Sequence, residues 1–116
     1  MKITFYGHSS IGIEVSGKHI LVDPFISGNP NASHIDINSL HADYILLTHA
    51  HNDHTLDVEA IAKRTNAIIV STYEVAAHFG EKGLQYHPMN HGGSWQFDFG
   101  KVKVVSAIHS SSFTDG

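Results

Sequence analysis

The chain has 116 residues, the size of one domain, and its 41% hydrophobic and 16% charged residues are typical of a folded globular protein. Eleven acidic residues against seven lysines and arginines give a formal net charge of -4, which argues against nucleic acid as the main partner because phosphate contacts need clustered cations. Cysteine is absent, so these residues form no disulfide bond, thiolate nucleophile or sulfur-ligated zinc site.

The sequence shows no membrane-spanning or secretory segment. Its apolar runs are short and broken by polar residues. Met1 and Lys2 lead directly into an alternating run, without the order of charged, apolar and small residues that marks a signal peptide. We therefore expect a cytoplasmic protein without a membrane partner, and the acidic balance favours a small-molecule substrate over a large nucleic acid.

The first third of the chain predicts an antiparallel meander. Residues 2–6 and 11–15 alternate between apolar and polar side chains, the period of half-buried strands. A short turn at residues 16–18 would pair the second strand with residues 18–22 as a hairpin. Residues 24–36 are rich in Gly, Pro, Asn and Ser, so we expect them to form a loop.

The middle of the chain predicts alternating strands and helices. Residues 44–47 and 67–70 are apolar throughout, as expected for strands that are buried on both faces. Between them Thr55 would cap a helix over residues 56–65, which has acidic residues in its first turn and basic residues in its last. This order of elements indicates an α/β layered sheet.

The last third predicts a second helix over residues 73–81, closed by Gly83, and then a hairpin formed by residues 95–99 and 102–105. Residues 110–116 are loop-like and leave the preceding strand uncovered, an open sheet edge of the kind that proteins usually avoid. We therefore expect residues 1–116 to be the N-terminal part of a single domain, completed by a continuation of the chain or by a second fragment.

Four side chains of types that ligate metals lie within six residues, directly after the predicted strand at residues 44–47: His49, His51, Asp53 and His54. A strand that runs into an extended loop sends alternate residues to one side, so His49 and His51 would direct two imidazoles at one point. Asp53 and His54 would direct a carboxylate and an imidazole at a neighbouring point. Such a cluster is unfavourable without a metal, because its members repel one another once protonated and bury badly when charged.

A catalytic ion needs a third protein ligand beside an open position. His109 is the best candidate, because it follows a predicted strand and sheet geometry brings such loops together at one edge. Asp53 and His54 would begin a second site, and two neighbouring ions can share and activate one water. Nitrogen and oxygen ligands suit zinc, manganese, iron and nickel, so we expect two divalent ions, with zinc the first choice.

Asp23 and His8 are candidates for supporting roles. Asp23 ends a strand before a proline, where it would either accept hydrogen bonds in a turn or orient a ligand imidazole. His8 and His91 lie in turn-like loops, where each would either support a ligand or be solvated. We expect no metal-site role for the remaining five histidines: His19, His34, His41, His78 and His87.

The histidine cluster resembles the signature of the metallo-β-lactamase superfamily, His-x-His-x-Asp-His after a buried strand, and matches it completely at residues 49–54. Three flanking motifs are similar to those of a bacterial and archaeal family described only as metal-dependent hydrolases and related to the ascorbate-phosphate lactonases: Gly7-His8-Ser9-Ser10, Val22-Asp23-Pro24-Phe25 and His109-Ser110-Ser111-Ser112. The resemblance covers residues 1–116. It implies a four-layer αββα sandwich with the metals at one edge of its two sheets, of which this chain is about the N-terminal half.

The resemblance also implies roles for the site residues. His49, His51 and His109 would hold one ion. Asp53 and His54 would hold the other, and Asp53 would also orient the attacking water. Asp23 matches the superfamily's strand-end aspartate, which supports the metal loop. A bridging aspartate and a last metal histidine belong to the second half of the family's domain and have no counterpart among these 116 residues.

The leading hypothesis is hydrolysis of a small ester-like substrate by a metal-bound hydroxide, with the ions stabilising the oxyanion. A lactone, thioester, amide or phosphodiester would suit such a centre. One alternative is an iron-dependent oxidoreductase on the same fold. His51 bears on it, because the superfamily's di-iron oxygen reductases have glutamate at that position whereas its persulfide dioxygenases keep histidine. The other alternative is a non-catalytic metal-binding module.

Overall fold

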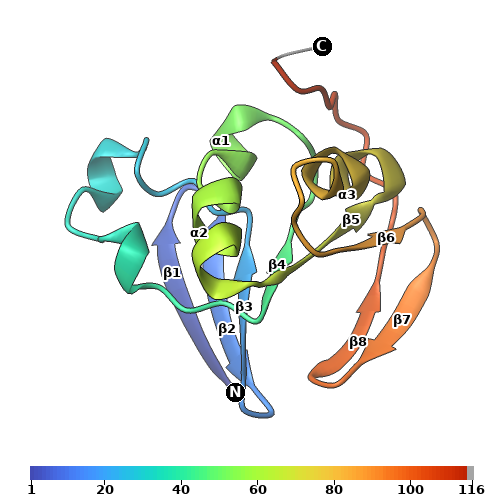
Figure 1. Cartoon of the computed structure of the whole chain (residues 1–116), viewed down its shortest axis with the longest axis horizontal. Helices are drawn as coiled ribbons and strands as arrows, with labels where there is room; N and C mark the ends of the chain where they lie inside the picture. Colours follow the sequence, from blue (N-terminus) through green and yellow to red (C-terminus); the bar gives the residue numbers. More distant parts are fainter. Residues whose placement is uncertain (115–116) are drawn as a thin grey trace.

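The computed structural model describes residues 1–114 and is built on one six-stranded sheet, in the order β1-β2-β3-β4-β5-β6 (Figure 1). The strands are β1 (Lys2–Gly7), β2 (Ser10–Val15), β3 (Lys18–Val22), β4 (Tyr44–Leu46), β5 (Ile68–Thr72) and β6 (Tyr86–Met89). The first three strands pair antiparallel, and β3 to β6 pair parallel. The carboxyl ends of β3, β4 and β5 therefore lie at one edge of the sheet.

The predicted N-terminal meander is confirmed. Across β2 and β3, Ile11 pairs with Val22, and the connecting turn is at residues 16–17. Both turn residues have positive φ, 52° and 73°, and the glycine adopts this conformation without steric cost. Between β3 and β4 the chain forms two short 3-10 helices, η1 (Pro30–Ala32) and η2 (Ile37–Ser39), in place of regular secondary structure.

Helices cover one face of the sheet (Figure 1). The three helices are α1 (Asn52–Thr55), α2 (Val58–Thr65) and α3 (Tyr73–Gly80). Ile45 and Ile69 project from β4 and β5 into the core beneath them, where they meet Ile61 of α2 and Phe79 of α3. All four side chains are at least 95% buried, so packing of this apolar layer fixes α2 and α3 on the sheet.

A second, two-stranded sheet packs against the opposite face. It consists of β7 (Ser94–Phe97) and β8 (Gly100–Lys103), paired antiparallel. Tyr44 of β4 and Phe97 of β7 lie with ring centroids 5.4 Å apart, and the Tyr44 hydroxyl donates a hydrogen bond of 2.9 Å to Asp98. The layers among residues 1–114 are thus helices, large sheet and small sheet, which confirms the predicted sandwich architecture for this part of it.

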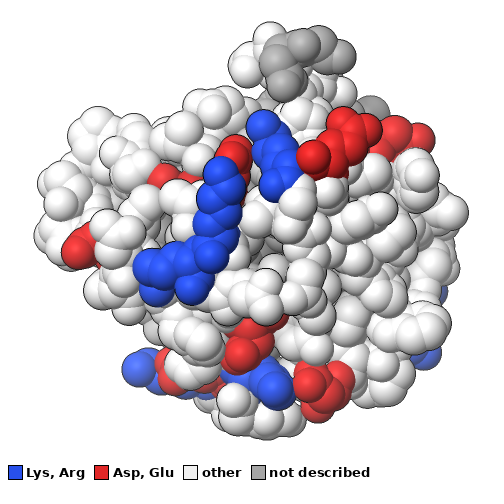
Figure 2. All heavy atoms as spheres, viewed as in Figure 1, with Lys and Arg blue, Asp and Glu red and all other residues white. Residues whose placement is uncertain are grey.

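Charges are interspersed on the face shown in Figure 2. Glu59 of α2 pairs with Lys63 at 2.7 Å and with Lys82 at 3.6 Å. These cations are partly neutralised, unlike the clustered cations that phosphate contacts need. Within the described residues, no helix combines the length and apolar character required to cross a membrane.

Two sequence expectations are wrong. Thr55 does not cap the helix that follows it but is the last residue of α1, and its hydroxyl donates to the carbonyls of Ala50 (3.3 Å) and His51 (3.1 Å). The N-cap of α2 is Asp57. The sequence also failed to predict β6, which contains Pro88; proline is tolerated there because, among residues 1–114, β6 pairs only with β5 and forms an edge.

The other predicted elements are confirmed to within two residues. The second predicted helix is α3, which ends at Gly80 and is followed by a turn in which Gly83 has a φ of 82°. The predicted hairpin is β7 and β8. Its second strand begins earlier than expected, because Gly100 adopts a φ of 149° and still pairs with Phe97.

Asp57 ties the loop after β3 to the start of α2. Its side chain is buried, and its carboxylate accepts hydrogen bonds from the backbone N–H groups of Ile26 (2.7 Å) and Ser27 (2.9 Å) and from the Ser27 hydroxyl. Its own N–H donates to the carbonyl of Pro24 at 3.1 Å. These contacts fix the segment that leaves the sheet edge after β3.

Replacing Asp57 by alanine should destabilise the fold by about 2–4 kcal/mol, because the N–H groups of Ile26 and Ser27 lose their acceptor in a buried setting. Asp57→Asn retains one acceptor oxygen and should lose less. The free energy of unfolding from urea denaturation measures both effects. The exposed Glu81→Ala serves as control and should stay within about 0.5 kcal/mol of the parent protein. An Asp57→Ala variant as stable as this control would contradict the assignment.

Candidate metal centre

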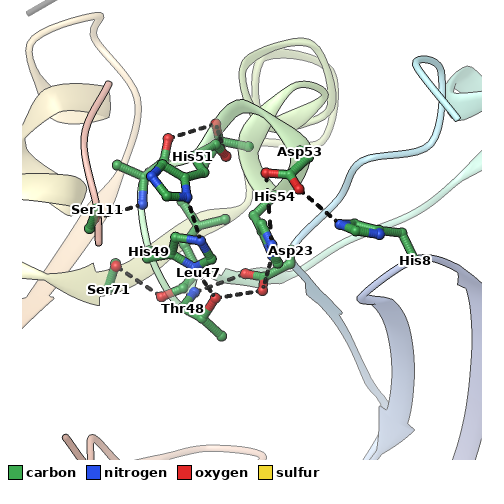
Figure 3. Close-up of polar contacts among 12 residues, drawn as sticks. His8, Asp23, Leu47, Thr48, His49, His51, Asp53, His54, Ser71 and Ser111 are labelled. Atoms are coloured by element: carbon green, nitrogen blue, oxygen red, sulfur yellow. Dashed lines mark hydrogen bonds and ion pairs between the residues drawn. The ribbon is translucent and has the colours of Figure 1, made fainter. Parts of the chain in front are cut away.

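Apart from His109, which Figure 3 does not label, the predicted site residues are shown there together at the sheet edge formed by the carboxyl ends of the parallel strands. Asp23 follows β3 directly, and the loop at residues 48–51 connects β4 to α1. His109 arrives on the segment after β8, and its ring centroid lies 4.5 Å from that of His49. Ligands tend to bind at this end of an open parallel sheet, because several loops converge there.

Asp23 is at the base of the site. Only 2% of its surface is exposed, and its φ of 45° turns the chain sharply out of β3. Its Oδ1 accepts from the Thr48 N–H at 2.8 Å, and its Oδ2 accepts from the Thr48 hydroxyl at 2.6 Å. The same Oδ2 lies 2.8 Å from Nδ1 of His54. The geometry therefore combines both roles considered from the sequence, turn acceptor and partner of an imidazole.

These contacts determine which ring nitrogens are free. His54 donates Nδ1–H to the Asp23 carboxylate, which leaves its Nε2 lone pair for another partner. Thr48 gives its hydroxyl proton to the same carboxylate, so the oxygen accepts from His49 Nδ1–H at 2.9 Å. His49 therefore also presents Nε2 to the site.

The first cluster comprises His49, His51 and His109. Their potential ligand atoms all lie within 4.8 Å of one another. His49 Nε2 and His51 Nδ1 are 3.2 Å apart, and the ring of His109 lies 5.3 Å from that of His51. His109 Nδ1 donates to the Ser110 carbonyl at 2.7 Å, which leaves its Nε2 free. Three imidazole nitrogens this close together are a donor set that suits zinc and related divalent ions.

Burial lowers the pKa of His49 below its usual value, and the neighbouring imidazoles of His54, His109 and His51 lower it further. The shift favours the neutral ring, whose lone pair is the form that binds a metal. The crowding expected from the sequence is thus present, and it disfavours protonation of the cluster.

The second cluster comprises His8, Asp53 and His54, whose potential ligand atoms also lie within 4.8 Å of one another. His8 Nε2 lies 3.0 Å from Asp53 Oδ2. Burial opposes ionisation of Asp53, but the hydrogen bond from His8 and the proximity of His54 outweigh it and hold the pKa of this carboxyl below its usual value. His8 was expected from the sequence only in a supporting role, and no local motif indicated that it would reach Asp53.

The segment after β8 is held against the metal loop at two points. The Ser111 hydroxyl accepts a hydrogen bond from the Ala50 N–H at 3.1 Å. Phe113 stacks on His78 of α3, with ring centroids 3.7 Å apart and an interplanar angle of 14°. These contacts fix the segment that directly follows His109. His78 therefore has a packing contact and lies outside both clusters, as do His19, His34, His41, His87 and His91.

A family model described as the metallo-beta-lactamase superfamily matches residues 3–111. The chain belongs to this superfamily. The match includes both clusters and most of the six-stranded sheet. The architecture expected from the resemblance is therefore confirmed at the level of the family.

Relatives within the superfamily carry a more specific name. The chain is 72% identical over 116 residues to a UPF0173 metal-dependent hydrolase of Flavobacterium johnsoniae, covering 100% of this chain and 52% of the relative. It is 51% identical to a UPF0173 metal-dependent hydrolase of Bacillus subtilis, covering 99% of this chain and 50% of the relative. The chain thus spans about half the length of the curated relatives it matches.

Two solved structures support the fold. A metallo hydrolase from the archaeon Ignicoccus hospitalis superposes with a TM-score of 0.85 and 32% identity, covering 98% of this chain and 51% of that one. An isothiocyanate hydrolase from Delia radicum gut bacteria superposes with a TM-score of 0.61 and 21% identity, covering 84% of this chain and 44% of that one. The second likeness bears on the fold alone.

Asp23→Asn should weaken metal binding by roughly 10–100-fold, because the amide NH₂ would oppose the donors of Thr48 or His54 and release a ligand imidazole from its orientation. Competition with a chromogenic chelator measures the affinity. Asp36→Asn is the matched control, since that exposed aspartate lies outside both clusters and asparagine can also accept from the Asn38 N–H. Equal affinities in the two variants would show that Asp23 does not support the site.

Proposed function

We propose that this protein is a metal-dependent hydrolase with its first ion on His49, His51 and His109. The observation that carries the proposal is the convergence of three imidazoles, two of them with ligand atoms 3.2 Å apart, at the loop end of the sheet. The names of the curated relatives support it. Because the chain spans about half of their length, the activity of the whole protein is part of the proposal.

Asp53 and His54 would hold a second ion beside the first. The rings of His49 and His54 are 4.2 Å apart, so the two sites are close neighbours. Both donor sets are compatible with divalent ions, and zinc, manganese, iron and nickel all accept imidazole and carboxylate ligands. When bound, such ions activate water and polarise the bond under attack.

Asp53 is the catalytic residue that we assign on this chain. Its side chain is half exposed and its pKa lies below the usual value, so the carboxylate is ionised at neutral pH. A partly exposed acceptor at this edge can hold the hydrogen of an attacking water and orient its lone pair towards a substrate. The buried Asp23 has no such access and acts by orienting His54.

The substrate that we propose is a small ester-like molecule: a lactone, thioester, amide or phosphodiester. Each has an electrophilic carbonyl or phosphorus whose developing oxyanion is stabilised by adjacent cations.

His51→Ala should remove the first ion and lower hydrolysis by more than about 100-fold, since even residues that only support metal ligands account for 10–100-fold. Elemental analysis reports the metal content, and initial rates on a lactone, a nitrophenyl ester and a phosphodiester report activity. His34→Ala, an exposed histidine outside both clusters, is the control.

Full metal content and full activity in His51→Ala would refute the assignment. Bound iron with oxygen consumption, and no hydrolysis of any of the three substrates, would instead favour an iron-dependent oxidoreductase. Bound metal without any turnover would favour a non-catalytic binding module.

A further inference from the structure

The turn between β1 and β2 places His8 against the start of α1. His8 is the first residue of a two-residue turn, flanked by the paired residues Gly7 and Ser10. Its φ of 53° follows a φ of 114° at Gly7, and this reversal sends the side chain across the sheet edge. Figure 3 shows His8 reaching Asp53 from a separate part of the chain, on the side away from His49.

The distances within the second cluster lie on either side of those expected between ligands of one ion. His54 Nε2 and Asp53 Oδ1 are 3.9 Å apart, too far for a hydrogen bond. With bonds of 2.0–2.2 Å in a tetrahedral arrangement, neighbouring ligand atoms lie about 3.3–3.6 Å apart. The distance from His8 Nε2 to Oδ2 of Asp53, 3.0 Å, lies just below this range. The distance from His54 Nε2 to the other carboxylate oxygen, Oδ1, is 3.9 Å and lies just above it.

The potential ligand atoms of all three side chains also lie within 4.8 Å of one another. Asp23 holds Nδ1 of His54, so Nε2 of that ring is turned towards the cluster. The rings of His8 and His54 have centroids 5.3 Å apart and are tilted by 56°, so they are not stacked face to face. The edge of the His8 ring is supported by Phe25, at 5.6 Å between centroids. A metal that binds Nε2 of His8 would displace the hydrogen that this nitrogen shares with Asp53.

We propose that His8 is a direct ligand of the second ion, together with Asp53 and His54. The inference rests on the proposed metal-dependent function and deepens it, because the second site then has three protein ligands within this chain. Two imidazole nitrogens and one carboxylate oxygen, with a fourth position open, form a donor set found in catalytic zinc sites. The second site is therefore able to bind an ion before any bridging carboxylate is added.

His8→Gln separates direct ligation from a hydrogen-bonding role. The glutamine amide reaches about as far as Nε2 of histidine and can still donate to Asp53, but its nitrogen has no lone pair for a metal. In the zinc-loaded protein the metal content should fall from two ions to one per chain. The affinity for the second ion should fall by more than roughly 100-fold, beyond the loss caused by supporting residues.

A spectroscopic measurement provides a readout that a structural role would not change. In the cobalt-loaded protein, each imidazole ligand contributes a hyperfine-shifted, solvent-exchangeable N–H proton signal. If His8 is a ligand, the parent protein should show five such signals, three from the first cluster and two from the second, whereas a structural role for His8 would leave four. Because His8→Gln loses the second ion, it should lose the signals of both His8 and His54. The matched control is His91→Gln, a histidine beside Gly92 in another exposed turn and outside both clusters, which should retain the signals and both ions.

His8→Asn provides a second test if His8→Gln fails to fold, because asparagine readily adopts the positive φ of this turn. It should likewise bind one ion. Two tightly bound ions in a folded His8 variant, or a single ion in the parent protein, would overturn the proposal. A protein that loses one ion when His8 is changed but hydrolyses none of the test substrates would support His8 as a metal ligand. It would contradict the proposed hydrolase activity.

Discussion

The carboxylate of Asp23 is the contact on which the rest of the centre depends. It is buried where β3 leaves the sheet and accepts hydrogen bonds from the Thr48 N–H, the Thr48 hydroxyl and His54. Because the Thr48 hydroxyl is thereby committed as a donor, it can only accept from His49. One carboxylate thus fixes the free nitrogen of two imidazoles that belong to different clusters.

The close spacing of the two clusters means that they do not act independently. The ring of His49 lies 4.2 Å from that of His54 and 4.5 Å from that of His109. Burial and the neighbouring imidazoles disfavour protonation of His49, whose pKa is lowered. Ions bound at the two points would likewise influence each other's affinity, so their loading is expected to be coupled.

Features encoded by neighbouring residues could be predicted from the sequence. The meander and the buried strands followed from periodicity, and the candidate metal loop was proposed from four ligand-type residues within six positions. The contact between His8 and Asp53 could not, since 45 residues separate them and only the pairing of β1 with β2 brings the turn to α1. The prediction for Thr55 was wrong because its hydroxyl donates to the carbonyls of the preceding residues Ala50 and His51 and does not cap the helix that follows.

The chain order of the ligands has a consequence for assembly. His8, Asp53 and His54 all precede residue 55, whereas the first cluster also needs His109 and the contacts of Ser111 and Phe113 that hold it in place. During synthesis from the N-terminus, the second cluster therefore has all its members long before the first. An ion captured there would cross-link the β1–β2 turn to α1 and favour the native pairing of the meander, so that the metal would guide folding as well as catalysis.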